Sequence, residues 1–484
     1  MTTKTIAERL ALWVHSSSLR DFPDEALLQA KRCIVDVTGV ALAGAVHDTV
    51  RKVRELTCSA SAAGAATLWG TRGPALSAEA AALCNAVAAH VLDYDDTCYD
   101  GIVHGSAAVW PAVLACGQAT GASGSALLAA FIAGVECEYA LGRALSDDVY
   151  FKGWWTSGVL GAIGAAAGAS KVLGLGAAAT RNAISLAACQ ATGLRAMIGT
   201  DAKPFALGRA AQTGVQAARY ALAGLDAPCD AFESERGFVK VFADGRFDEE
   251  RFALGTRYSL VDPGIAFKLF PACSATQAAT EAVLALVFEH GLTPEAIVSV
   301  ECEVTPLVAI SLMYDRPRTR TEAQFSLPYA VGCALRYHSF GVKQMNAPTY
   351  DDAAMLEVMQ KVRMVRNDAL EAAEDGRRRN PEGARVTIRL REGRVLQSYN
   401  GAATGMPDKP MPDASLDRKF MVCASTVLEK ADAEKLFAQL SSLEQGAAAP
   451  FPLTPTLSPL QQGEETSAPA SRDTSARTSR PCRG

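Results

Sequence analysis

The strongest constraint on the fold is the helical periodicity that fills residues 1 to about 262. Apolar residues recur at spacings of three and four in FPDEALLQAKRCIVDVTGVALAG, LSAEAAALCNAVAAH and SALLAAFIAGVECEYALGRAL, as expected of helices with a buried face. Alanine and glycine lie on several faces of these helices, and small residues allow helices to approach closely. The sequence therefore predicts a large all-helical bundle domain over residues 1–264, with buried central helices.

The pattern changes at Asp262-Pro263-Gly264. VSVECEV (298–304) alternates, which predicts a strand with Val298, Val300, Cys302 and Val304 on one face. ARVTIRLREGRVLQSYNG (384–401) alternates on both sides of Glu392-Gly393 and predicts a β-hairpin. Between them, TRTEAQFSLPYAVGCALRYH (319–338) predicts one helix, with Thr319 and Glu322 as its capping box.

These elements predict a mostly α protein with a smaller α/β (α+β) lid domain at 265–400. Residues 401–445 are expected to form C-terminal helices that rejoin the helical domain. From residue 446 the chain is rich in proline, serine, threonine and arginine, and such a segment buries too little apolar surface to offset its ordering entropy. We therefore predict a disordered tail over 446–484 that carries no chemistry.

Composition excludes several classes of function. The chain has 484 residues and a net charge of −5, without a long basic run, so nucleic acid is not an expected partner. Its thirteen cysteines include no C-x-x-C pair, which predicts reduced thiols in a cytoplasmic protein and argues against a cysteine-held metal. Residues 106–135 carry no charge, but Pro111 and the GASGS segment divide them, so we predict buried core helices and no membrane partner.

The segment LDYDDTCYDGIVHGS (92–106) places four aspartates close to His104. A solvated acidic turn is one interpretation. A second is a divalent-metal site, since Asp95, Asp96 and Asp100 spell D-D-x-x-x-D, but the nearest partner segment, NDALEAAED (367–375), lacks the expected hydroxyl. The third is an acid/base pocket. If the preceding helix continues through Asp93, then Asp93 and Thr97 share a face, with His90 close by.

Two lysines lie in unusual contexts. In TDAKPFALGRAAQTG, Lys203 is expected in a short polar loop before Pro204 and a small-residue helix that carries Arg209. In GIAFKLFPAC, Lys268 is flanked by aromatic residues. An ammonium against an apolar wall is best stabilised by a carboxylate or another anion. The alternative is that each side chain extends along its own stem to solvent.

Four segments in order resemble the MmgE/PrpD family: HVLDYDDT…HGSAAVWPA, GLRAMIGTDAKPFALGRAAQTG, AFKLFPACSATQAA and AQFSLPYAVGCAL. That family includes 2-methylcitrate dehydratases, cis-aconitate decarboxylases and iminodisuccinate epimerases. The resemblance covers about residues 5–445. It implies a cytoplasmic homodimeric enzyme that needs no metal or other cofactor, with its site between a helical domain and an α/β lid.

The resemblance also implies the site residues. It assigns catalytic roles to Asp93, His104, Lys203, Lys268 and Tyr329, and places Thr97 in the pocket. We add Trp155, Arg209 and Gln277 as substrate-binding candidates. The sequence departs from the family pattern at four positions, where Cys98, Trp155 and Gln277 replace histidines and Gly105 replaces a proline.

The family chemistries share the breaking of a bond alpha to a carboxylate, which needs cations or hydrogen-bond donors around the electron-rich intermediate. We expect a small di- or tricarboxylic acid as substrate, smaller or less charged than 2-methylcitrate because three histidines are replaced. A hydro-lyase of the 2-methylcitrate type is the first expectation. The alternatives are an epimerase of an iminodisuccinate-like acid, a cis-aconitate-type decarboxylase and an inactive member of the family.

Overall fold

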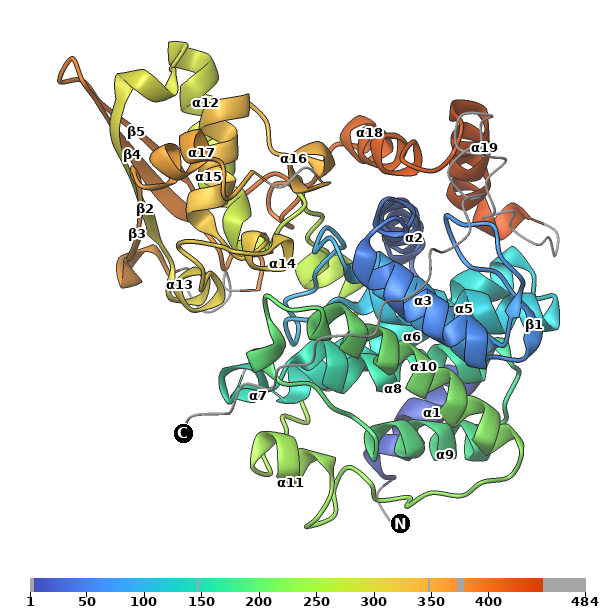
Figure 1. The fold of residues 1–484 in the computed structure, drawn as a ribbon. Coiled ribbons are helices and arrows are strands. Elements are labelled where there is room, and N and C mark those ends of the chain that lie inside the picture. The colour runs from blue at the N-terminus through green and yellow to red at the C-terminus, as the bar shows by residue number, and fades with distance from the viewer. Residues whose placement is uncertain (1–3, 146–147, 347–348, 372–377, 447–484) are drawn as a thin grey trace, which may run out of the picture.

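The computed structural model describes residues 4–145, 148–346, 349–371 and 378–446. The predicted tail at 446–484 therefore lies, except for its first residue, outside the described residues. The chain forms a large helical body beside a smaller body that carries a sheet (Figure 1). The expected mostly α fold with a smaller α/β part is confirmed.

The helical body contains eleven labelled helices and one short strand within residues 4–264. Their bounds are α1 (Ile6–Ser16), α2 (Asp24–Gly44), α3 (Asp48–Ala60), β1 (Ala63–Ala66), α4 (Ala78–His90), α5 (Gly105–Thr120), α6 (Gly124–Leu145), α7 (Asp148–Phe151), α8 (Thr156–Val172), α9 (Ala177–Ala188), α10 (Ala202–Leu222) and α11 (Phe238–Ala243).

The central helices α4, α5, α8 and α10 pack against one another because glycine and alanine face their contacts. At Gly214 of α10, an added Cβ would lie only 2.4 Å from the side chain of Ala165 on α8. A larger residue there would force the two helices apart. The high glycine and alanine content of these helices therefore causes the close helix packing that the sequence predicted.

The predicted division of the uncharged run at GASGS is confirmed, because α5 ends at Thr120 and α6 begins at Gly124. By length and composition α6 could cross a bilayer, and α2 with α3 would pass the same test as a pair bent by 87°. However, 89% of the most apolar part of α6 is buried inside the bundle. Core helices of this kind have the same composition as membrane spans.

The smaller body contains a four-stranded sheet in the order β3-β2-β4-β5, covered on one face by α12 and α15 (Figure 1). β2 pairs with β3 in parallel and with β4 antiparallel, and β4 and β5 form the predicted hairpin. The bounds are α12 (Gln277–His290), β2 (Ile297–Val304), α13 (Pro306–Ser311), α14 (Arg320–Ala323), α15 (Leu327–Tyr337), α16 (Val342–Asn346), α17 (Ala353–Met359), β3 (Val362–Arg366), β4 (Ala384–Leu390) and β5 (Val395–Asn400).

Two local predictions in this body were wrong. A register irregularity between Ile297 and Ser299 turns Val298 outward, so that it is 52% exposed while Ile297 is buried. The single helix predicted at 319–338 is two helices: Thr319 caps α14 as expected, but Ser326 caps a new helix, α15. Pro328 explains the break, because it lacks an N–H and is favoured in the first turn of a new helix.

After the sheet, the chain returns to the helical body. α18 (Asp413–Ala424) and α19 (Lys430–Ser441) pack on α2 and share its apolar core through Leu416, Phe420 and Leu436. Lys419 of α18 pairs with the buried carboxylate of Asp36 on α2 at 2.7 Å. The two bodies are thus joined twice, at residues 260–270 and again beyond Asn400.

Candidate active site

The loop that follows α4 supplies the centre of the site. The helix ends at His90, and Asp93 has a φ of +48°, so the helix does not continue through Asp93 and the shared helical face of Asp93 and Thr97 does not form. Aspartate is among the few residues that tolerate this left-handed conformation. The turn lets a single aspartate face the lysines of two distant segments.

Asp93 lies between Lys203 and Lys268. Its Oδ2 is 3.0 Å from Nζ of Lys203, at the start of α10, and its Oδ1 accepts a hydrogen bond from Lys268, whose Nζ also donates to the Asp93 carbonyl at 2.8 Å. All three residues are buried. Neither lysine reaches solvent along its own stem, so the carboxylate-paired interpretation of both is correct.

Asp93, Lys203 and Lys268 form the Asp93 group, and their charges stabilise one another. Burial favours a protonated Asp93, but the two ammonium groups outweigh it and hold the pKa of Asp93 well below its usual range. Burial likewise disfavours the charge of Lys268, and Asp93 reverses this effect so that the pKa of Lys268 is raised. The site therefore presents two buried ammonium groups with one carboxylate between them.

His90 and Asp95 extend this group. His90 Nδ1 lies 2.9 Å from a carboxylate oxygen of Asp95, and its Nε2 lies 2.8 Å from Nζ of Lys203. Since an ammonium can only donate, His90 Nε2 accepts from Lys203 and Nδ1 carries the hydrogen that Asp95 accepts. Burial lowers the pKa of His90, in keeping with this neutral tautomer. Sequence reasoning assigned neither residue to the site.

His104 presents a free ring nitrogen to the cavity. Its Nδ1 lies 2.8 Å from the Asp96 carbonyl oxygen, which can only accept, so Nδ1 carries a hydrogen and Nε2 keeps its lone pair. Burial lowers the pKa of His104 to about 3. His104 is thus a neutral imidazole able to accept a proton, and Thr97 Oγ1 lies 3.4 Å from its Nδ1.

The remaining aspartates of the loop are neither solvated nor arranged around a shared metal position. Asp95, Asp96 and Asp100 are fully buried, and each has separate partners. Ser106 donates to Asp96 at 2.5 Å, whereas Ser259 donates to Asp100 at 2.7 Å. The solvated-turn and D-D-x-x-x-D interpretations both fail because the side chains diverge into different parts of the core.

A small cavity lies between the two bodies beside this group. Its volume is about 40 Å³, room for a few water molecules, whereas ligand pockets usually measure several hundred Å³. The structure therefore has its two bodies closed on each other. Asp93, Thr97, His104, Trp155, Lys203, Tyr150, Ile102, Ile198, Cys273, Ser274, Leu307, Ser311, Phe325 and Glu382 line the cavity.

Glu382 is a cavity residue that sequence reasoning missed. It precedes β4 and is 5% exposed; its oxygens accept hydrogen bonds from Tyr99 at 2.6 Å and from Ser274 at 3.0 Å. Burial raises its pKa to about 7, although the two hydrogen bonds lower it. The sequence around Glu382, NPEGA, contains no motif that indicates a functional residue. The CSATQ motif, distant in sequence but close in space, contains its partner Ser274.

Two predicted residues lie away from the cavity. Arg209 is exposed and contacts Gln212 in a surface groove between α3, α4 and α10; it is six positions from Lys203, about 120° around the helix from the buried face. Tyr329 is buried inside the smaller body, where its hydroxyl donates to the Gln344 carbonyl at 2.9 Å. Neither contacts the Asp93 group, so neither belongs to the site in this closed structure.

Gln277 holds the Lys268 segment and does not line the cavity. Its Oε1 accepts from the backbone N–H groups of Leu269 and Phe270, both at 2.9 Å, and its Nε2 donates to the Phe270 carbonyl at 3.0 Å. The substrate-binding role predicted for Gln277 is therefore replaced by a positioning role. An amide that both donates and accepts suits this task.

The other departures from the family pattern also have local causes. Cys98 is 1% exposed and packs in the core of the helical body, so it does not line the acid/base cavity. At Gly105 an added Cβ would lie 2.6 Å from the hydroxyl of Tyr139, so Tyr139 fills the space that a proline ring would need. Trp155 does line the cavity, with its ring centroid 5.3 Å from that of His90.

His90, Asp95 and His104 each offer one potential metal-ligand atom, and these atoms lie within 4.8 Å of one another. The donor types suit zinc or another transition metal. Lys203, however, donates its ammonium to His90 Nε2, and a cation would lie close to this positive charge. The donor set fits a hydrogen-bond relay better than a metal site.

The fold and site together define a two-domain protein with a small cavity between a helical domain and an α/β domain, lined by buried lysine, carboxylate and imidazole groups. The MmgE/PrpD N-terminal domain matches residues 8–250, and the MmgE/PrpD C-terminal domain matches residues 270–445. The chain belongs to the MmgE/PrpD family.

Curated relatives match along nearly their whole length. Cis-aconitate decarboxylase of Mus musculus is 28% identical over 464 residues, 92% of each chain, and that of Homo sapiens is 28% identical over 467 residues, 92% of this chain and 93% of the relative. Cis-aconitate decarboxylase of Aspergillus terreus is 25% identical over 456 residues, 89% of this chain and 91% of the relative. These relatives are enzymes of the lyase type.

Proposed function

We propose that this protein is a lyase that removes CO₂ from cis-aconitate or a closely related unsaturated tricarboxylic acid. The observation that carries the proposal is the pair Lys203 and Lys268 on one buried carboxylate in the cavity. Full-length similarity to cis-aconitate decarboxylases supports decarboxylation over the dehydration expected first from the sequence. Dehydration and epimerisation remain the alternatives.

The two ammonium groups are the proposed binding site for substrate carboxylates. Each Nζ has three N–H donors and uses two of them, Lys203 on His90 and Asp93 and Lys268 on two oxygens of Asp93. The third donor of each ammonium group is the proposed contact for an incoming carboxylate. Because the cavity of about 40 Å³ cannot hold a tricarboxylate, we propose that the two domains move apart to admit substrate and then close on it less completely than in this structure. Closure then excludes water and strengthens the electrostatic stabilisation of the intermediate.

The reaction needs a proton after the carbon–carbon bond breaks. Loss of CO₂ from a saturated carbon next to the double bond leaves an electron pair that shifts through the double bond toward another carboxylate. A proton then adds to the carbon alpha to that carboxylate, which gives an unsaturated dicarboxylic acid. We propose that Glu382 supplies this proton, because its pKa of about 7 keeps part of the population protonated near neutral pH.

The proposed role of His104 differs between decarboxylation and the two alternative reactions. Its unprotonated Nε2 suits the abstraction of an alpha proton, the first step of epimerisation or dehydration. Decarboxylation needs no such base. For this reason, Glu382→Gln is expected to impair a decarboxylase through its protonation step, whereas His104→Gln would block exchange of an alpha proton in the other two reactions.

Proton NMR in D₂O tests the proposal with cis-aconitate, 2-methylcitrate, citrate and an iminodisuccinate-type acid, each with and without EDTA. Decarboxylation converts cis-aconitate to a five-carbon dicarboxylate with one solvent deuterium on carbon. A new alkene signal from 2-methylcitrate or citrate would indicate a dehydratase, and deuterium incorporation without net conversion an epimerase. Loss of activity with EDTA would favour the His90 group as a metal site, and silence across the panel would favour an inactive member.

A further inference from the structure

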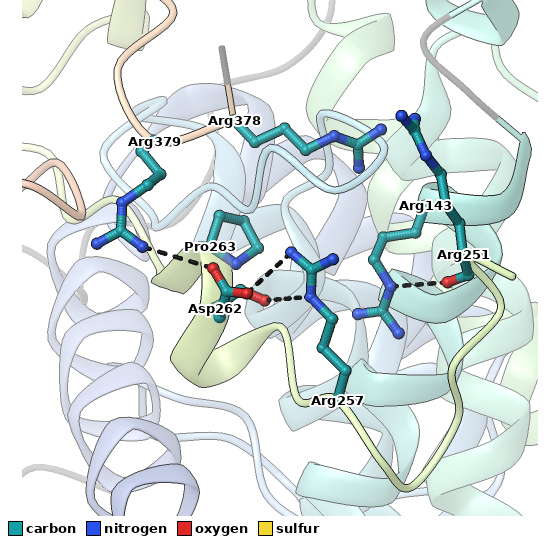
Figure 2. A pocket seen from close by; sticks show the side chains of 7 residues that line it. All are labelled: Arg143, Arg251, Arg257, Asp262, Pro263, Arg378 and Arg379. Carbon is teal, nitrogen blue, oxygen red and sulfur yellow. Dashed lines mark hydrogen bonds and ion pairs between the residues drawn. The ribbon is translucent and has the colours of Figure 1, made fainter. Parts of the chain in front are cut away.

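A second cavity lies at the junction of the two domains, apart from the acid/base cavity. Its volume is about 800 Å³. Five arginines and one carboxylate line it, together with Pro263 (Figure 2): Arg143, Arg251, Arg257, Arg378, Arg379 and Asp262. This concentration of guanidinium groups on one cavity is unusual in a protein whose net charge is negative.

Arg143 is the buried member of this arginine cavity. Its side chain is 1% exposed; Nε donates to the Arg251 carbonyl at 3.0 Å, and Nη1 contacts Ser259 and Asp100. Its Nη2 is buried and has no hydrogen-bond partner among the residues that the structure describes. A buried N–H of a charged group is costly to leave unpaired, and an oxygen of a bound anion would satisfy it.

Arg257 and Arg379 approach the same carboxylate from two sides. Nη2 of Arg257 lies 3.1 Å and Nη1 of Arg379 lies 3.5 Å from oxygens of Asp262, which is 56% exposed (Figure 2). Asp262 therefore contacts two guanidinium groups in the place where an external anion would bind, and Arg379 is also paired with Asp408. Asp262 is a competitor that a ligand with several negative charges can displace.

The cavity spans the connection between the domains. Arg143, Arg251 and Arg257 belong to the helical domain, Arg378 and Arg379 precede β4 in the other domain, and Asp262-Pro263 lie in the first connecting segment. A ligand that contacts both sets of arginines would bridge the two domains. The volume of the arginine cavity falls in the range of small-molecule sites.

We propose that the arginine cavity binds a small polyanion with at least two phosphate or carboxylate groups. Arg143 Nη2 and the guanidinium groups of Arg257 and Arg379 would contact it. Fork-shaped guanidinium groups recognise both oxyanions with paired hydrogen bonds, so the class of ligand is defined by its charge and by the spacing of its oxygens.

Isothermal titration calorimetry at constant ionic strength tests the proposal with pyrophosphate, tricarballylate and the monoanion acetate. We expect saturable binding of pyrophosphate or tricarballylate, at least tenfold tighter than acetate; the tighter of the two identifies a phosphate or a carboxylate ligand. Asp262→Asn, which removes the competing carboxylate, should tighten binding at least threefold. Arg257→Gln with Arg379→Gln should weaken it at least tenfold.

Two controls distinguish binding in the arginine cavity from binding elsewhere on the protein. Lys203→Gln should leave pyrophosphate binding unchanged, and it weakens any binding of tricarballylate, a tricarboxylate like the proposed substrate, in the acid/base cavity. Loss of pyrophosphate binding in that variant would place the ligand in the acid/base cavity and overturn the proposal. Arg366→Gln with Arg394→Gln removes two exposed arginines on the smaller domain and should have no effect. Absence of binding by both polyanions, or no change with Asp262→Asn in a protein with a wild-type circular dichroism spectrum, would also refute the proposal.

Discussion

Tyr99 donates a 2.6 Å hydrogen bond to Oε2 of Glu382, and so joins the aspartate-rich loop of one domain to the segment before β4 in the other. Both residues are buried. The bond places an acidic group of the smaller domain beside the cavity that the helical domain supplies with lysines. In the proposed mechanism, closure of the domains would thus bring the proton donor together with the lysines that bind the substrate carboxylates.

Replacing Glu382 by glutamine should lower kcat for CO₂ release by about a hundredfold, the low end of the effect of removing a proton donor. The pKa of Glu382 is about 7, so wild-type kcat should fall as the pH rises through 7 and the donor is deprotonated. This fall of kcat is the alkaline limb of the pH profile, and Glu382→Gln should lose it. Glu303→Gln, on the central strand β2, should keep it. An unaltered profile in Glu382→Gln would assign the proton to another group.

Replacing Tyr99 by phenylalanine should move the same limb toward higher pH. The Tyr99 hydrogen bond lowers the pKa of Glu382, so its loss leaves burial less opposed and the pKa rises further above 7. The measurement is kcat between pH 6 and 9. Tyr258→Phe removes a hydroxyl on the surface and serves as the control; a shift toward lower pH in Tyr99→Phe would contradict the assignment.

Asp93→Asn should destabilise the protein because two buried ammonium groups lose their shared partner, which costs about 3–5 kcal/mol for a buried ion pair. The pKa of folded Asp93 lies well below its unfolded value. Its contribution is therefore complete above about pH 4, the unfolded pKa, and is lost as the pH falls toward the folded pKa. Urea unfolding at pH 7 and at pH 3 measures both effects.

The difference in stability between wild type and Asp93→Asn should therefore be smaller at pH 3 than at pH 7. Asp48→Asn, on an exposed carboxylate, should change stability by less than about 0.5 kcal/mol at either pH. A difference that does not depend on pH would mean that the pKa of Asp93 is the same in the folded and unfolded protein, and a difference that is larger at pH 3 would mean that the folded protein holds Asp93 protonated.

The sequence predicted the parts of the fold and site that depend on local pattern. Helical periodicity located the bundle, alternation located the β4–β5 hairpin, and the order of the motifs brought Asp93, Thr97, His104, Lys203 and Lys268 to one place. It could not predict the left-handed turn at Asp93, because that conformation is held by contacts with residues more than a hundred positions away. The same limit hid Glu382, whose role comes from a neighbour 283 positions earlier.

Arg209 and Tyr329 show the opposite error, since their motifs are in register but their side chains point elsewhere. Arg209→Gln should therefore change kcat/KM by less than twofold. Tyr329→Phe should also leave kcat/KM nearly unchanged but lower the free energy of unfolding by about 1 kcal/mol, because a buried hydrogen bond to Gln344 is lost. A hundredfold loss of kcat in Tyr329→Phe would show that the domains rearrange to bring this hydroxyl to the substrate.

Trp155 should set the size and charge of the acid that the cavity accepts. It is 3% exposed, and its ring lies 5.4 Å from Nζ of Lys203, so it fills volume and offers an apolar face where the family pattern has a histidine. Trp155→His opens space and adds a hydrogen-bond donor, so kcat/KM for 2-methylcitrate should rise at least tenfold relative to cis-aconitate, equivalent to about 1.4 kcal/mol. Trp155→Phe keeps the apolar face and should preserve the wild-type preference.

Competition assays with both acids measure the ratio directly. Full wild-type activity on 2-methylcitrate, together with an unchanged ratio in Trp155→His, would show that Trp155 does not select the substrate.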